Sequence, residues 1–90
     1  MHIDHQPQRE RFATTIDGHE AELEYRREGD VLVITHTGVP EAIGGRGIAG
    51  ALVQAAVDFA REAGLRVRPA CTYAAGWMDR HLDDGDALRA

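Results

Sequence analysis

The sequence offers one cysteine, Cys71, for disulfide chemistry, so no internal disulfide can form. Disulfides are typical of oxidising compartments, and we therefore predict a cytoplasmic location. Long hydrophobic runs are also missing, because none approaches the roughly 20 residues of a membrane-spanning helix. The polar start, MHIDHQPQRE, lacks the apolar stretch of a signal peptide. A membrane-embedded or secreted protein is therefore not expected.

Basic residues are in the minority, since ten stand against fifteen acidic ones and leave a net charge of −5. Proteins bind nucleic acids largely through positively charged side chains that contact the phosphates, so no nucleic-acid partner is expected.

The length of 90 residues fits one domain and excludes a barrel of eight strand–helix units. Residues 1–10 show no apolar periodicity. We predict that they form a flexible, unpaired lead-in to a single domain over residues 11–90.

The first half of that domain predicts three antiparallel strands. Residues 12–16 form a short strand, and Asp17-Gly18 is a strong hairpin signal. Apolar and charged residues alternate over residues 20–27, which indicates a strand with one buried and one wet face. Residues 31–37 are β-branched and apolar on both faces, as expected of a central strand.

The second half changes to helical periodicity after a loop over residues 38–46. Apolar residues recur every three or four positions over residues 47–63, which predicts a long helix. Residues 65–71 follow as a fourth strand, and Thr72 can cap a short last helix ending at His81. A strand reached through a helix normally lies parallel to the strand before it. The predicted fold class is therefore α+β, with a mixed sheet and the order β-β-β-α-β-α.

The segment Gly44-Gly45-Arg46-Gly47-Ile48-Ala49-Gly50 carries the clearest functional signal. Glycines at the start of a helix let the backbone approach a ligand closely and direct free N–H groups outward. The first turn of a helix adds unpaired donors and a partial positive charge, which suit a phosphate or pyrophosphate. Arg46 would add a full charge. The alternative is that these glycines only form a tight turn between a strand and a helix.

Three phosphate-binding patterns compete for this loop. A Walker loop needs Gly-Lys-Ser/Thr at its end, where this chain has Gly47-Ile48-Ala49. The dinucleotide fingerprint G-x-G-x-x-G is matched literally by Gly45, Gly47 and Gly50. That motif leaves its strand directly and needs an acidic residue about 20 positions later, and neither condition holds here.

The third pattern resembles the coenzyme-A-binding core of the GNAT superfamily of N-acetyltransferases, whose usual signature is Arg/Gln-x-x-Gly-x-Gly/Ala. Gly47 and Ala49 occupy the last two positions of that signature. The chain more closely resembles the small single-domain N-acetyltransferase-like proteins over residues 11–82. That resemblance rests on three segments at the right spacing, His36–Pro40, Gly45–Ala49 and Pro69–Tyr73.

Two positions depart from the pattern of these proteins. Gly44 stands where the signature has Arg or Gln, which removes one side-chain anchor for the cofactor and keeps the N–H donor. Gly38 stands where the small proteins usually carry a larger residue, often Glu. The second departure leaves that position without a carboxylate base.

The resemblance implies acetyl-CoA as the cofactor and a place for each of its parts. Backbone groups near Thr37 and Val39 would hold the pantetheine arm, with the pyrophosphate over the glycine loop. Residues after the last strand would flank the thioester. The cofactor-binding residues implied in this way are Thr37, Val39, Gly44, Gly45, Arg46, Gly47, Ile48, Ala49, Thr72, Tyr73 and Ala74.

Two residues are predicted to be catalytic, Cys71 and His36. Cys71 comes immediately before a helix, whose positive end favours a thiolate. It is a candidate for accepting the acetyl group, for protonating the leaving thiolate, or for a purely structural place as a small buried residue. His36 ends the central strand, where an imidazole can take up a proton near neutral pH. A histidine that is only hydrogen-bonded at a sheet end fits the same pattern.

Other polar residues give weaker signals. Tyr73 is a candidate acid, or a core partner of Trp77 one turn away. Glu41 is a loop carboxylate near the expected pocket, or simply a solvated side chain. The remaining histidines are scattered, and no metal site is predicted. The wet side of the second strand could attract a cationic amine through Glu20, Glu22 and Glu24.

The predicted function is the acetyl-CoA-dependent transfer of an acetyl group to an amine of a small molecule or a protein. The departures at Gly38 and Gly44 favour an alternative, a non-catalytic acyl-CoA-binding or protein-interaction module. A third interpretation, in which the glycine loop is only a turn, predicts an obligate subunit that binds no cofactor. The acceptor and the oligomeric state stay open at this point.

Overall fold

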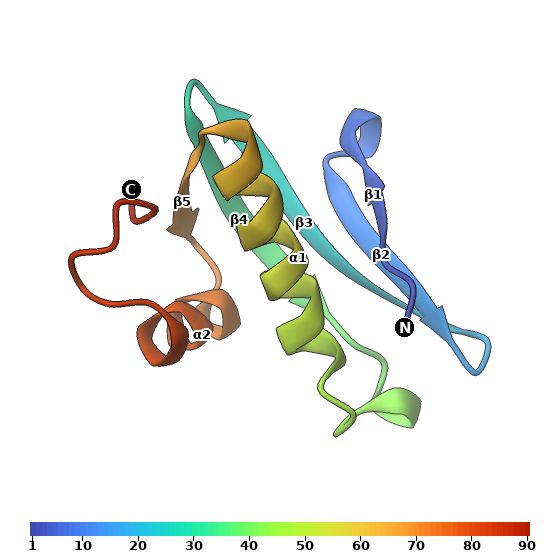
Figure 1. The fold of residues 1–90 in the computed structure, drawn as a ribbon. Coiled ribbons are helices and arrows are strands. Elements are labelled where there is room, and N and C mark those ends of the chain that lie inside the picture. Colours follow the sequence, from blue (N-terminus) through green and yellow to red (C-terminus); the bar gives the residue numbers. More distant parts are fainter.

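A computed structural model describes residues 1–90 as a five-stranded sheet with two α-helices (Figure 1). Single 3₁₀ turns lie at Pro7–Arg9 and Glu41–Ile43. The strands and helices follow in the order β1 (Asp4–Gln6), β2 (Arg11–Ile16), β3 (His19–Glu28), β4 (Val31–Gly38), α1 (Ile48–Ala63), β5 (Arg66–Pro69) and α2 (Thr72–His81). Neither helix combines the length and the hydrophobicity that crossing a membrane requires.

The strands lie in the sheet in sequence order, β1-β2-β3-β4-β5. The first four are antiparallel neighbours, and β5 pairs parallel with β4 after the crossover through α1. The predicted α+β fold class, with its meander, long helix and parallel last strand, is therefore confirmed. Tight turns make the meander possible, because Asp17 (φ 51°) and Gly18 (φ 78°) both adopt the left-handed conformation of a two-residue hairpin loop.

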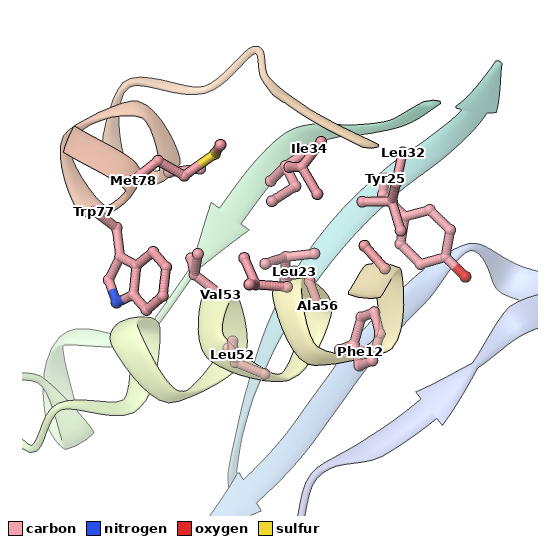
Figure 2. Packing of buried hydrophobic residues seen from close by; sticks show 14 of the residues in the cluster. Phe12, Leu23, Tyr25, Leu32, Ile34, Leu52, Val53, Ala56, Trp77 and Met78 are labelled. Atoms are coloured by element: carbon pink, nitrogen blue, oxygen red, sulfur yellow. The ribbon is translucent and has the colours of Figure 1, made fainter. Parts of the chain in front are cut away.

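The hydrophobic core lies between one face of the sheet and the two helices (Figure 2). Alternate residues of β3, among them Leu23 and Tyr25, point toward α1, while Glu22 and Glu24 lie on the other face. Trp77 of α2 packs into the same core cluster as α1. We call the face toward α1 the helix side of the sheet. The opposite face, which carries Glu20, Glu22 and Glu24, is called the open side.

A β-bulge at Thr35 interrupts β4 near its end. Tyr25 pairs with Ile34 and Glu24 pairs with His36, so Thr35 has no residue opposite it. The extra residue reverses the alternation of β4. His36 therefore shares the open side with Glu24, and Thr37 lies on the helix side, paired with Leu23.

The pairing of β4 with β5 stops beside this bulge. The paired residues extend from Val31, which lies opposite Arg66, to Ile34, which lies opposite Pro69. The carbonyl of Ile34 then accepts hydrogen bonds from the N–H groups of both Ala70 (2.9 Å) and Cys71 (3.2 Å). Beyond Ile34, β4 has no neighbouring strand on that edge.

The N-terminal segment corrects one prediction, because residues 1–10 are not an unpaired lead-in. Asp4–Gln6 forms β1, which pairs with β2. His5 stacks on Phe12 with ring centroids 4.1 Å apart, and its Nε2 lies 2.6 Å from the hydroxyl of Tyr25. Burial lowers the pKa of His5 below its ordinary value of 6.5. The sequence does not reveal this short strand, because a three-residue segment before Pro7 has no readable alternation.

Candidate functional site

A hollow of about 250 Å³ lies where the glycine loop passes into α1. It is lined by Val39, Gly44, Gly45, Gly47, Ile48, Ala49, Gly50 and Tyr73. All of these except Gly50 are among the predicted cofactor-binding residues. The structure thus gathers most of the predicted cofactor site around one concave surface at the start of a helix.

The wall of this hollow is built from backbone rather than from side chains. Gly45 and Gly47 both have φ 75°, a left-handed conformation that costs other residues free energy. A Cβ atom at either position would project into open space. Gly47 is the N-cap of α1 and has no side chain to accept from the first N–H groups of the helix, which have no intrahelical acceptor either. Open space in front of free donors suits an anionic group such as a pyrophosphate.

Gly50 sets the distance between α1 and the start of α2. A Cβ on Gly50 would lie 3.3 Å from the Tyr73 hydroxyl and 3.6 Å from Nε1 of Trp77. Trp77 is buried in the core, whereas Tyr73 is 39% exposed and lines the hollow. Tyr73 and Trp77 lie one helical turn apart, but only Trp77 is a core residue. Tyr73 presents its hydroxyl at the edge of the hollow.

Cys71 and Thr37 meet at the end of the β4–β5 pairing. Cys71 is the N-cap of α2, and its Sγ accepts a hydrogen bond from the Ala74 N–H at 3.4 Å. The hydroxyl of Thr37 lies 3.4 Å from the same sulfur. A helix N-terminus and a hydroxyl both stabilise a thiolate, and the thiol is half-buried. The position supports both a structural capping role and a chemical one.

The structure places four predicted cofactor residues outside the lining of the hollow. Arg46 directs Nη1 to Oδ2 of Asp17 at 2.7 Å, in the turn between β2 and β3. Thr37 lies at Cys71, and Ala74 is fully buried beneath α2. Thr72 is exposed in the first turn of α2. Their roles toward a cofactor stay predictions.

The open side carries a second polar group of residues at the same end of β4. Nε2 of His36 lies 3.6 Å from Oε1 of Glu22, which is longer than a hydrogen bond. With 54% of its side chain exposed, His36 is not a buried structural histidine. Glu41, in contrast, is an exposed residue of the 3₁₀ turn before the glycine loop.

Ligand atoms of Glu22, Glu24 and His36 all lie within 4.8 Å of one another. Such a group can hold a metal ion, but two of its three members are exposed, and exposed acidic groups commonly lie this close without one. The sequence pattern presents Glu22 only as part of a wet strand face. Its position beside His36 follows from strand register and from the bulge at Thr35, which no sequence spacing reveals.

Comparison with known proteins decides the family. The family model described as GCN5-related N-acetyl-transferase matches residues 11–87. The chain belongs to this family. Relatives include Protein NATD1 of mouse (Mus musculus), 40% identical over 76 residues, which span 81% of this chain and 69% of the relative. Protein NATD1 of human (Homo sapiens) is 38% identical, with 81% of this chain and 67% of the relative covered.

A solved structure agrees with the family assignment. The solution NMR structure of a GCN5-like protein from Staphylococcus aureus, proposed to be an N-acetyltransferase, superposes with a TM-score of 0.70 at 29% identity. The match covers 88% of this chain and 78% of the other. The resemblance seen in the glycine loop and its flanking segments is thus confirmed at the level of the family and the fold. Members of the GCN5-related family generally use acetyl-CoA.

Proposed function

We propose that this GCN5-related domain is an acetyl-CoA-dependent N-acetyltransferase that transfers an acetyl group to an amine. The observation that carries the proposal is the hollow at the N-terminus of α1, which is lined by glycine backbone in a chain of this family. When bound, acetyl-CoA supplies an activated acetyl thioester. The proposed acceptor is an amine of a small molecule or of a protein.

The residues at the hollow fit a coenzyme A pyrophosphate in charge and in shape. Free N–H groups of Ile48 and Ala49 and the positive end of the α1 dipole would hold its negative charge. Glycines at 45 and 47 leave the space that side chains would fill. Val39 and Ile48 provide apolar surface beside these donors. No cationic side chain lines the hollow, because Arg46 is paired with Asp17.

The chemistry is proposed to take place where Thr37 and Cys71 meet. A thiolate at Cys71 would be stabilised by the Ala74 N–H and the Thr37 hydroxyl, and would serve as an acetyl-accepting nucleophile. A protonated Cys71 would instead give its proton to the departing thiolate. Tyr73, whose hydroxyl lies at the rim of the hollow, is a second proton donor in reach of solvent.

The first test is calorimetric titration of the protein with acetyl-CoA, with CoA alone as a second ligand. We expect saturable binding of both, because the pyrophosphate site does not depend on the acetyl group. Binding should be lost in Gly47→Val. If neither ligand binds at millimolar concentration, the proposed function is wrong and the glycine loop is only a turn.

The second test asks whether Cys71 carries the acetyl group. All ten basic residues of the chain are arginines, so no lysine side chain can be acetylated and confuse the result. After incubation with acetyl-CoA, mass spectrometry should find one acetyl group on Cys71 that hydroxylamine removes. Cys71→Ser keeps a capping oxygen and should carry no thioester. Transfer to amines at the wild-type rate in Cys71→Ser would exclude the nucleophile role.

A non-catalytic acyl-CoA-binding module is the second candidate. It is favoured by the absence of a side-chain anchor at Gly44 and of any cation in the lining of the hollow. This candidate predicts binding of acetyl-CoA without transfer to any member of a panel of primary amines, and without an acetyl adduct on the protein.

A further inference from the structure

Glu22 and His36 form a polar pair on the open side of the sheet, directly over Gly38. Glu22 lies opposite Gly38 in the register between β3 and β4, and His36 is two residues before it on the same strand. Nε2 of His36 is 3.6 Å from Oε1 of Glu22, and the two side chains are 54% and 28% exposed. The two acceptors are therefore close without being joined by a hydrogen bond to each other.

Gly38 is the residue that leaves room for this pair. A Cβ at position 38 would lie 2.9 Å from Nε2 of His36 and 3.0 Å from Oε1 of Glu22. Gly38 does not have the positive φ of the turn glycines, so its backbone conformation does not itself require glycine. What glycine provides here is the absence of a Cβ that would push the two side chains away.

The pair also lies next to the proposed site of chemistry. Thr37, between His36 and Gly38, points to the helix side and contacts Cys71. The β4–β5 pairing has already ended at Ile34, so this stretch of β4 has no strand beside it on the edge away from β3. An acetyl group held at Thr37 and Cys71 and an amine held at Glu22 and His36 would approach the end of β4 from opposite faces.

We propose that Glu22 and His36 receive the ammonium group of the acceptor and that His36 removes its proton, in an arrangement that the absence of a side chain at Gly38 permits. This proposal rests on the acetyltransferase function proposed above. Two acceptors 3.6 Å apart can both lie about 2.8–3.0 Å from one ammonium nitrogen, so a single –NH₃⁺ group can donate to both. The substrate class is therefore a primary amine that is protonated in solution.

The acceptor R–NH₃⁺ gives one proton to the neutral imidazole of His36, which passes it to solvent. The neutral amine attacks the acetyl carbonyl, so that a C–N bond forms and the C–S bond breaks. The nitrogen loses its second proton, which ends on the departing sulfur as a thiol. The Glu22 carboxylate holds the ammonium before the transfer and stabilises the imidazolium after it.

The binding test is an NMR titration of the isotope-labelled protein with butylammonium chloride, without any coenzyme. We expect saturable shifts at the His36 ring and the Glu22 side-chain carboxyl. These shifts should be lost in Glu22→Gln and in Gly38→Ala, and kept in Glu62→Gln, which removes the same charge from an exposed position of α1. Tetramethylammonium has the charge without N–H donors and should not reproduce the shifts. Absence of the shifts in the wild-type protein, or equal shifts with tetramethylammonium, would overturn the proposal.

The turnover test compares butylamine with aniline, which is already neutral at neutral pH. With butylamine, kcat should fall about 100-fold in His36→Gln, and KM should rise about tenfold in Glu22→Gln. With aniline, both variants should stay within about twofold of the wild type, because no proton has to be removed first. Equal losses with both amines would show that the substitutions only damage the fold and would overturn the assigned roles.

These outcomes separate the two proposals. If acetyl-CoA does not bind, or if the wild-type protein transfers acetyl to neither amine, the acetyltransferase function fails while the NMR titration still decides whether Glu22 and His36 bind an ammonium group. If transfer occurs and the His36→Gln and Glu22→Gln variants both behave like Glu62→Gln, the function holds and the acceptor site is elsewhere.

Discussion

The two sides of the end of β4 are built in different ways. On the helix side, the hollow is formed by glycine backbone and the N-terminus of α1, and few side chains reach into it. On the open side, the polar pair consists of two side chains, one from β3 and one from β4. The hollow depends on the absence of side chains at the glycines of one continuous segment, residues 44–50. The polar pair depends on which residues of two strands come to lie opposite each other.

This difference has a consequence for substitution. A backbone site is damaged by almost any added Cβ, because space and left-handed conformation are its functional features. A side-chain site is damaged by loss of one charge or one ring nitrogen, while the backbone tolerates the change. The hollow should therefore respond to steric substitutions, whereas the open side should also respond to isosteric ones.

The largest effect is expected from Gly47→Val. The branched side chain would extend into the hollow, and the left-handed conformation would cost roughly 1–3 kcal/mol of stability. We expect the dissociation constant for acetyl-CoA to rise at least about 100-fold, which corresponds to about 2.7 kcal/mol. Calorimetry measures the binding and thermal unfolding measures the stability.

Gly29→Val is the matched control for this change. Gly29 also has a positive φ (60°) and open space where a Cβ would project, but it lies in the turn between β3 and β4, at the opposite end of β4 from Gly38. This variant should lose similar stability and keep its affinity for acetyl-CoA. Equal loss of affinity in both variants would mean that the hollow contributes nothing beyond the fold.

Cys71 contacts Thr37 at the end of β4, and its substitution separates capping from chemistry. Cys71→Ala removes the acceptor of the Ala74 N–H and should cost about 1 kcal/mol of stability. Cys71→Ser should keep that stability and still lose the acetyl adduct. Chemical denaturation gives the stabilities, and mass spectrometry gives the adduct. An equally unstable serine variant would contradict the capping role.

His5 lies in β1, at the edge of the sheet, and is expected to make the stability of the fold depend on pH. Because burial lowers the pKa of His5 in the folded state, the unfolded chain binds a proton more readily. Stability is therefore fully present above the unfolded pKa of about 6.5 and is lost as the pH falls from there toward the lower folded pKa. We expect the melting temperature to drop by a few degrees over this range.

His5→Gln can retain a hydrogen bond to Tyr25 and removes the titration, so its melting temperature should change less between pH 7 and pH 5. His2→Gln, at an exposed position, serves as the control and should keep the wild-type pH dependence. If both variants behave alike, His5 is not the group responsible.

The smallest effect is expected from Gly50→Ala. Alanine is favoured over glycine inside a helix by roughly 0.5–1 kcal/mol. The added Cβ would lie 3.3 Å from the hydroxyl of Tyr73, the mobile end of an exposed side chain that can move aside. Stability should rise slightly while acetyl-CoA affinity falls severalfold, because Tyr73 and the new methyl group narrow the hollow. A rise in both would show that Gly50 has no role at the site.

The sequence is sufficient for features that lie within one continuous segment. The last helix, over residues 72–81, is predicted by its sequence and is helical in the structure, and the glycine loop indicates a hollow that is present. Features that depend on contact between distant segments cannot be predicted in this way. β1 is defined by its pairing with β2, and the neighbourhood of Glu22 and His36 depends on register. Alternation within a strand does not contain that information.

The bulge at Thr35 determines which side chains at the end of β4 lie on each face of the sheet. With strict alternation, His36 would follow Leu32 and Ile34 to the helix side, and Thr37 would follow Val31 and Val33 to the open side. The bulged residue exchanges the two, so that His36 lies on the open side, where we propose that the amine binds, and the Thr37 hydroxyl faces the sulfur of Cys71. Deleting Thr35 would leave an unbroken ladder in which His36 and Thr37 keep these two faces, so the bulge places both side chains correctly in spite of one extra residue.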